Sequence, residues 1–159
     1  MIDNTHFDIL NVIETHGTYQ PEKPAVCCGE TTRSWQDLKQ NINKVANFFK
    51  EIGVSKGDNV ALLIGNRPEI IELIFGIVKT GACVVPLSGL LTKEQVTVLV
   101  NNSNAKLFVV DNEFKNLVTS DTSRLFKKFI KKYNLPFVCT WLGSNLSIYD
   151  KKNYCGRLG

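Results

Sequence analysis

Apolar residues recur along the chain with two different spacings, and each spacing predicts one kind of element. Over residues 35–52 they stand three or four positions apart, which predicts an amphipathic helix. The same spacing predicts helices over about 68–80 and 92–101. Short continuous apolar runs precede or separate these helices, and such runs are typical of parallel strands buried on both faces. The runs are 60–64, 82–85 and 106–110.

The order of these elements predicts an α/β fold, namely a partial parallel sheet with flanking helices. Right-handed crossovers would place the helices on the faces of the sheet. Ahead of this unit, residues 25–28 and 31–33 predict a hairpin. Residues 1–24 lack either spacing and are predicted to be a polar lead-in.

Three of the predicted helices have recognisable start signals. Ser34 is followed three residues later by Asp37, and Thr92 by Gln95, which is the spacing of a capping box. Asn66 is predicted to cap the helix that has Pro68 in its first turn.

The pattern weakens beyond residue 114, where the polar residues 119–123 read as a linker or junction. Residues 124–133 predict a short helix with an apolar stripe, and residues 136–140 predict another strand. The stripe consists of Leu125, Phe126, Phe129 and Ile130.

The net charge of the chain changes sign near the same position. The 159 residues carry 19 Lys and Arg against 15 Asp and Glu, a formal net charge of +4. Residues 1–121 hold 11 basic and 14 acidic side chains, so their balance is 11 − 14 = −3. Residues 122–159 hold 8 basic side chains and 1 acidic side chain, so their balance is 8 − 1 = +7. Such asymmetry indicates two parts of different origin.

Residues that could carry catalysis are sparse. There is no G-x-x-x-x-G-K-[ST] loop, no G-x-G-x-x-G turn and no G-x-S-x-G elbow. His6 and His16 have no carboxylate or thiolate at ligand spacing, so both are predicted to be surface residues. We therefore predict no catalytic residue and no metal site, and we assign no cofactor-binding residue.

Asp111 follows a predicted strand, at the edge where doubly wound sheets bind ligands. The favoured interpretation is a turn residue that accepts hydrogen bonds from loop amides. The cysteines are predicted to be reduced core residues of a cytoplasmic protein. They are Cys27, Cys28, Cys83, Cys139 and Cys155.

The predicted helix over 124–133 has a basic face opposite its apolar stripe. We interpret this face as an ordinary solvated helix surface, in preference to a nucleic-acid or membrane-binding surface. Its basic residues are Arg124, Lys127, Lys128, Lys131 and Lys132. No stretch reaches the length of a membrane span, and we predict no nucleic-acid partner. Apolar surface and a sheet edge left open by a partial sheet predict marginal stability and self-association.

Residues from about 24 to 115 resemble the N-terminal part of the adenylate-forming enzymes, the acyl-CoA synthetases and other AMP-dependent synthetases/ligases. The order and spacing of five blocks carry this resemblance. The blocks are Thr32–Leu38, Gly53–Leu63, Asn66–Glu69, Val78–Leu87, and Leu91–Glu94 with Asn102–Lys106.

The resemblance implies a truncated N-terminal subdomain of an ATP-dependent, carboxylate-activating ligase over residues 1–118. An intact relative would use ATP with Mg²⁺ and CoA. The family's phosphate loop, Tyr-Gly-x-Thr-Glu segment, ribose-binding Asp and C-terminal Lys have no counterpart here. The resemblance therefore predicts a fragment that is not catalytic by itself.

Residues 124–159 resemble the central domain of thiamine-diphosphate-dependent enzymes such as acetolactate synthase, through 131–143 and 153–159. That resemblance implies a Rossmann-like β-α-β fragment over 119–159 and a family that uses thiamine diphosphate or flavin. Our hypothesis is a composite chain joined near residues 116–123. Three alternatives remain: a divergent synthetase tail, a functional thiamine-type fragment, and a small nucleotide- or acyl-binding or interaction module.

Overall fold

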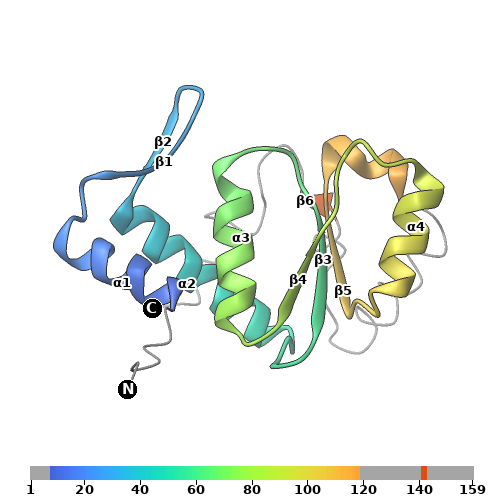
Figure 1. Ribbon diagram of the computed structural model, residues 1–159, viewed down its shortest axis with the longest axis horizontal. Helices are drawn as coiled ribbons and strands as arrows, with labels where there is room; N and C mark the ends of the chain where they lie inside the picture. The colour runs from blue at the N-terminus through green and yellow to red at the C-terminus, as the bar shows by residue number, and fades with distance from the viewer. Residues whose placement is uncertain (1–7, 119–140, 143–159) are drawn as a thin grey trace, which may run out of the picture.

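The computed structural model describes residues 8–118 and 141–142. The described elements form one four-stranded parallel sheet with helices on both faces, and a separate hairpin (Figure 1). The α/β fold with a partial parallel sheet is therefore confirmed. The predicted helix over 124–133 and the predicted strand over 136–140 lie outside the described residues.

The lead-in is the first departure from the predictions, because residues 9–19 form helix α1 (Ile9–Tyr19). Asp8 caps this helix, and its side chain accepts a hydrogen bond from the Leu10 amide at 2.9 Å. The helix buries only Ile13. That single buried position explains why the apolar spacing did not reveal the helix, whose stability depends on packing against other elements.

The hairpin and the helix that follows it form as predicted. Strands β1 (Pro24–Cys28) and β2 (Thr31–Ser34) pair in antiparallel fashion. Helix α2 (Trp35–Glu51) then begins with the capping box of Ser34 and Asp37. In Figure 1 the hairpin projects from the end of the molecule that α1 and α2 form. Its turn lies away from the parallel sheet.

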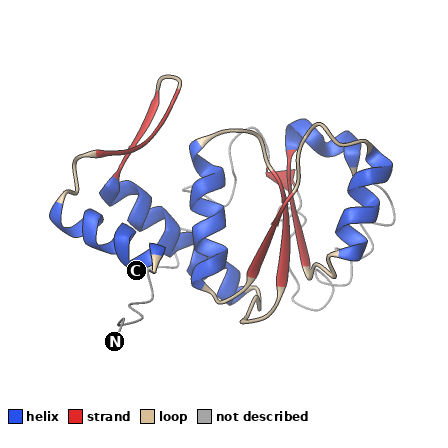
Figure 2. Ribbon diagram, viewed as in Figure 1, coloured by secondary structure: helices blue, strands red, loops and turns tan. Residues whose placement is uncertain are grey.

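The parallel sheet, whose strands are red and lie between the blue helices in Figure 2, has the strand order β4-β3-β5-β6. Its strands are β3 (Asn59–Leu63), β4 (Cys83–Pro86), β5 (Leu107–Asp111) and the two-residue β6 (Trp141–Leu142). Helix α3 (Pro68–Lys79) connects β3 to β4, and helix α4 (Lys93–Asn102) connects β4 to β5. A short 3₁₀ helix, η1 (Asn112–Leu117), follows β5.

Alternate residues of the strands face opposite sides, as the pleat requires. On the α3 side, Val60 and Leu62 of β3 join a core with α2 and α3. On the α4 side, Ala61 and Leu63 join a second core with α4 and η1. The capping box of Thr92 and Gln95 begins α4 as predicted.

Strand β4 was predicted to be a buried strand, and this prediction is wrong. It is an edge strand whose residues are exposed or half-buried, among them the exposed Cys83. The Cys83 amide donates to the Asp58 carbonyl oxygen at 2.8 Å, and the Leu87 amide donates to the Leu62 carbonyl oxygen at 2.7 Å. The backbone polar groups of the alternate residues, Val84 and Pro86, therefore point away from β3. Since proline has no N–H, the outer edge of the strand offers one donor and is a poor template for self-association.

Candidate functional site

The carboxyl edge of the sheet is where the topology favours a site. The chain leaves β3 toward α3 on one side, and it leaves β5 toward η1 on the other. Neighbouring strands whose connections diverge in this way form the switch point at which open parallel sheets bind ligands. We use the name switch-point edge for residues 64–67 and 111–114.

A buried ion pair joins the two halves of the switch-point edge. The Arg67 guanidinium pairs with the Asp111 carboxylate. The Asp111 side chain is 3% exposed and that of Arg67 is 26% exposed. Among the described residues, the buried Nε of Arg67 has no hydrogen-bond partner. The pair thus links the start of α3 to the end of β5.

Two sequence predictions are corrected at this point. Asn66 was predicted to cap α3, but the N-cap residue is Arg67 and its side chain makes no capping hydrogen bond. Asp111 lies at the predicted end of a buried strand, but its carboxylate pairs with Arg67 in place of the expected loop amides. Because α3 begins at Pro68, the residue before it, Arg67, is the N-cap. Parallel strands bring the residues that follow β3 and β5 to one edge, so Asp111 meets Arg67 there.

Two loop glycines, Gly65 and Gly89, lie close to side chains of η1. A Cβ atom at Gly65 would overlap the carboxylate of Glu113. A Cβ atom at Gly89, in the loop between β4 and α4, would overlap the ring of Phe114. Small residues at these two positions therefore let the loops that follow β3 and β4 approach η1 closely.

The hairpin is tied to the neighbouring part of α3 by a second set of charges. Arg33 of β2 contacts Glu69 at 3.2 Å and Glu72 at 3.4 Å. The Glu72 side chain is 1% exposed and also accepts a hydrogen bond from Asn41 Nδ2 at 2.8 Å. A buried carboxylate is tolerated when it is paired and hydrogen-bonded in this way. The sequence analysis missed these partners because they lie 31 to 39 residues apart.

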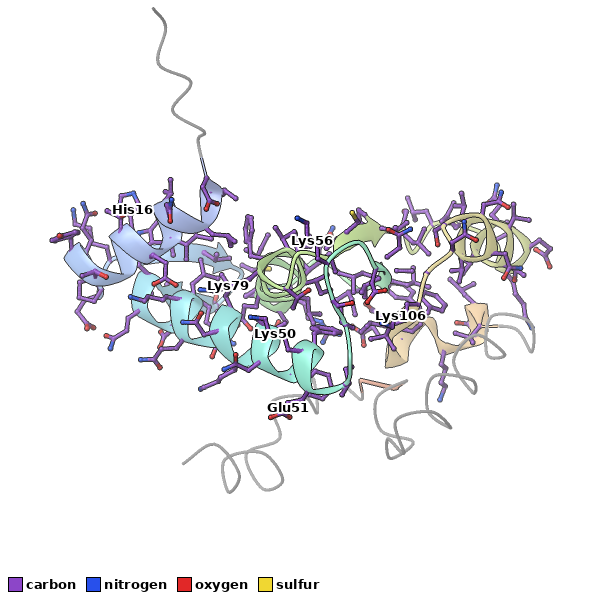
Figure 3. All side chains as sticks on the ribbon, turned by 90° about the horizontal axis from the view of Figure 1, so that it is seen from below. His16, Lys50, Glu51, Lys56, Lys79 and Lys106 are labelled. Atoms are coloured by element: carbon purple, nitrogen blue, oxygen red, sulfur yellow. The ribbon has the colours of Figure 1, made fainter. Side chains whose placement is uncertain are left out.

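Two lysines pair with carboxylates away from the switch-point edge, Lys106 at the opposite, amino edge of the sheet and Lys79 at the end of α3 (Figure 3). Lys106 Nζ lies 2.6 Å from Asp58 Oδ2 and 2.7 Å from the Gly53 carbonyl oxygen. Burial raises the pKa of Asp58, but hydrogen bonds from Lys106 and Ser55 outweigh it and leave that pKa below its ordinary value. Lys79 Nζ lies 2.7 Å from Glu14, and this hydrogen bond lowers the pKa of Glu14.

The remaining sequence candidates do not gather into a site. His16 lies on α1 and stacks on Trp35, with ring centroids 4.6 Å apart. Cys27, Cys28 and Cys83 are free but exposed, so their prediction as core residues is wrong. His6, Cys139, Cys155 and the basic residues of 124–133 lie outside the described residues.

Metal ligands and membrane spans were also sought among residues 8–118 and 141–142. No group of three or more His, Cys, Asp and Glu side chains there is placed to hold a metal ion. No helix in that part of the chain combines the length and the apolar character needed to cross a membrane. What the described residues show at the switch-point edge is the ion pair of Arg67 and Asp111.

Comparison with known proteins gives consistent matches in sequence. The family model described as AMP-binding enzyme matches residues 13–138. The crotonobetaine/carnitine–CoA ligase of Salmonella arizonae is 42% identical over 89 residues, which is 55% of this chain and 17% of that protein. Its counterpart from Escherichia coli O1:K1 is 43% identical over 81 residues, which is 51% of this chain and 16% of that protein. The chain thus spans about a sixth of these relatives.

Solved structures give the same picture for the fold. The anthranilate CoA ligase AuaEII, in complex with anthranoyl-AMP, matches with a TM-score of 0.70 and 25% identity over 91% of this chain and 26% of its own. Coronafacic acid ligase from Pectobacterium brasiliense matches with a TM-score of 0.65 and 23% identity, over 80% of this chain and 24% of its own. The N-terminal domain of FACL13 from Mycobacterium tuberculosis matches with a TM-score of 0.64 and 22% identity, over 87% of this chain and 34% of its own.

The same comparisons bear on the tail. The AMP-binding match runs through the predicted junction at 116–123 and on to residue 138. Strand β6, which belongs to the tail, pairs in parallel with β5 of the same sheet. The thiamine-diphosphate resemblance of residues 124–159 is therefore not supported. The predicted division into domains at residue 118 stays a prediction.

Proposed function

We propose, from the premise that this chain belongs to the AMP-binding enzyme family, that it is the N-terminal scaffold part of a carboxylate-activating CoA ligase. The observation that carries this proposal is the family match over residues 13–138. The sequence relatives, whose names describe CoA ligases, support the choice of reaction. The match to an isolated N-terminal domain supports the assignment to that end of the enzyme.

The proposed reaction of the longer protein has two steps. A carboxylate oxygen of the acid attacks the α-phosphorus of ATP, and pyrophosphate leaves with the electron pair of the broken P–O bond. The sulfur of a thiol such as CoA then attacks the acyl carbon of the adenylate. AMP leaves, the thiol proton is released to solvent, and a thioester is formed.

The role that we propose for this chain is positional. The Arg67–Asp111 pair fixes the loops that follow β3 and β5 relative to one another. In the longer protein this edge would support neighbouring segments that bind ATP, Mg²⁺ and the thiol. The chain by itself is therefore proposed to be non-catalytic.

A chimera tests the proposed scaffold role. The matched segment of the E. coli crotonobetaine/carnitine–CoA ligase is replaced by the corresponding residues of this chain. Thioester formation is then measured with crotonobetaine, ATP and CoA. We expect activity within about tenfold of the parent, since scaffold exchange leaves the transition-state contacts in place. A folded chimera without activity would contradict the proposal.

Calorimetry on the 159-residue chain tests the claim that the chain is not catalytic by itself. ATP, AMP and an acyl-CoA are titrated into the protein, and pyrophosphate release is followed with a panel of carboxylic acids. We expect neither saturable heat nor pyrophosphate. Saturable, stoichiometric heat with one nucleotide would favour the alternative of a small nucleotide-binding module.

A further inference from the structure

Helix α1 is attached to the rest of the chain by little apolar contact. Its buried residue is Ile13, which packs with Leu38 and Ile42 of α2. Ile9 and Tyr19 of the same helix are 40% and 79% exposed. The neighbouring α2, in contrast, buries six of its own residues. Because a short helix is marginally stable without packing, the polar contacts of α1 have to contribute to its docking.

A carboxylate beside the Ile13 contact lies between two lysines from different helices. Glu14 Oε1 lies 2.7 Å from Lys79 Nζ of α3, and Glu14 Oε2 lies 3.0 Å from Lys39 Nζ of α2. Lys79 Nζ also donates to Asn43 Oδ1 of α2 at 2.6 Å, and Lys39 Nζ donates to Thr18 Oγ1 of α1 at 3.2 Å. Lys79 thus lies between α1 and α2 (Figure 3). We use the name latch for Glu14, Lys39 and Lys79.

The helix is seated along one face of α3 and close against α2. On α3, Ile71 and Phe75 pack against the apolar cluster that α1 and α2 share, and Lys79 follows them at the same spacing of four residues. Residues at that spacing lie along one face of a helix. A Cβ atom at Gly17 of α1 would lie 2.7 Å from Lys39 Cδ, so α1 approaches α2 closely at this point. The latch therefore closes a contact that α1 makes with two helices.

The charges of the latch favour the docked helix at neutral pH. The basic groups that face Glu14 are Lys39 and Lys79, while His16 stacks on Trp35 of α2. The hydrogen bond from Lys79, opposed by burial, lowers the pKa of Glu14. Its contribution to docking is thus lost only as the pH falls through that lowered pKa. The latch side chains are 28–38% exposed, so dissolved salt can screen them at neutral pH.

We propose that α1 is a strap latched by charge, which opens as a unit while the parallel sheet and its helices stay folded. The latch holds α1 to α2 and α3 at once, and screening or removal of its charges releases the helix. Opening would uncover the apolar surface of Leu38 and Ile42 that Ile13 covers. The proposal is independent of the ligase proposal.

Hydrogen exchange of the 159-residue protein, followed by mass spectrometry at pH 7, tests the proposal without a substitution. Raising NaCl from about 0.1 M to about 1 M shortens the Debye length from about 10 Å to about 3 Å. Amides of α1 should then exchange at least about threefold faster, relative to a synthetic peptide of residues 8–20 in the same buffers, and amides of α3 should not change. An α1 rate that ignores salt, or equal acceleration in α1 and α3, overturns the proposal.

Two matched variants locate the latch. Glu14→Gln removes its carboxylate charge, and Glu51→Gln makes the same change at an exposed position where α2 ends, away from α1 (Figure 3). At about 0.1 M NaCl, Glu14→Gln should accelerate exchange in α1 about three- to tenfold and abolish the further acceleration by salt. Glu51→Gln should behave as the wild-type protein does. A salt response that persists in Glu14→Gln, or equal effects of the two variants, would overturn the assignment of the latch.

Discussion

The two sides of the parallel sheet bury their apolar residues to different extents. On the α3 side, thirteen buried residues form one core, and three partly buried ones pack against it. On the α4 side, seven residues are buried and six are only partly buried. The described residues therefore complete one side of the sheet more fully than the other.

The number of helical layers explains this difference. The α3 side is covered by α3, and α2 packs on it with Val45 and Phe49, which have no exposed surface. A Cβ atom at Gly76 of α3 would overlap Val45, so the two helices cross in close contact. Among described elements, α4 and η1 alone cover the other side. Stability should therefore depend mainly on the α3 side.

The largest expected effect comes from removing a matched aromatic ring on each side. Phe49→Ala should lower the free energy of unfolding by about 3–5 kcal/mol, because it leaves a cavity in a fully buried site. Phe114→Ala, at a partly buried site, should cost about 1–2 kcal/mol. Urea denaturation at pH 7 measures both. Equal losses would mean that the two sides are equally complete.

Breaking the ion pair between the two sides should rank next. Arg67→Met leaves the Asp111 carboxylate buried and unpaired, which should cost about 3 kcal/mol of unfolding free energy. The double variant Arg67→Met/Asp111→Leu removes both charges and should recover most of that loss. A double-mutant cycle in urea measures the coupling. If the loss of unfolding free energy in the double variant equals the sum of the losses in the two single variants, the two residues are not coupled.

Two glycines sharpen the comparison further. Gly76→Ala should cost about 1–3 kcal/mol, since the new methyl group meets Val45 and the Ala46 backbone on the α3 side. For Gly89→Ala, the nearest atoms to the new methyl group belong to the ring of Phe114, which is partly exposed and can move aside. Its cost should stay below about 1 kcal/mol. Thermal denaturation of both variants checks the order, and a reversed order would contradict the difference in burial between the two sides.

The smallest effect is expected at the amino edge. The pKa of Asp58 is lower in the folded chain than in the unfolded one, so its pairing with Lys106 stabilises the fold above about pH 4. That contribution is lost as the pH falls through the folded-state pKa. Asp58→Asn should therefore cost less than about 1 kcal/mol at pH 7, and its cost should be smaller at pH 2. Urea midpoints at both pH values test this, and a pH-independent difference would contradict it.

Elements with a strong local pattern could be predicted from the sequence. Helix α2 has a capping box and buries six residues at helical spacing, so its pattern defines both its start and its face. Strands β3 and β5 are continuous apolar runs, and such runs are typical of strands that are buried on both faces. Helix α1 escaped prediction because it buries one residue and depends on packing against α2.

The candidate site could be predicted only in part. Asp111 was placed correctly at the end of its strand, since a strand's end is a local property of the sequence. Its partner Arg67 could not be identified, because the two residues are 44 positions apart and meet only when β3 and β5 pair. The same holds for Arg33 and the buried Glu72.

Reading the amino-acid sequence was enough to predict the alternation of strands and helices, two capped helix starts and the family resemblance of residues 24–115. Each of these depends on residue spacing or on short blocks of the chain. Tertiary structure alone decided that β4 is an edge strand, that three cysteines are exposed, and that the switch-point edge is closed by an ion pair. Burial and pairing depend on which distant segments become neighbours, and strand order fixes that only when the whole sheet has formed.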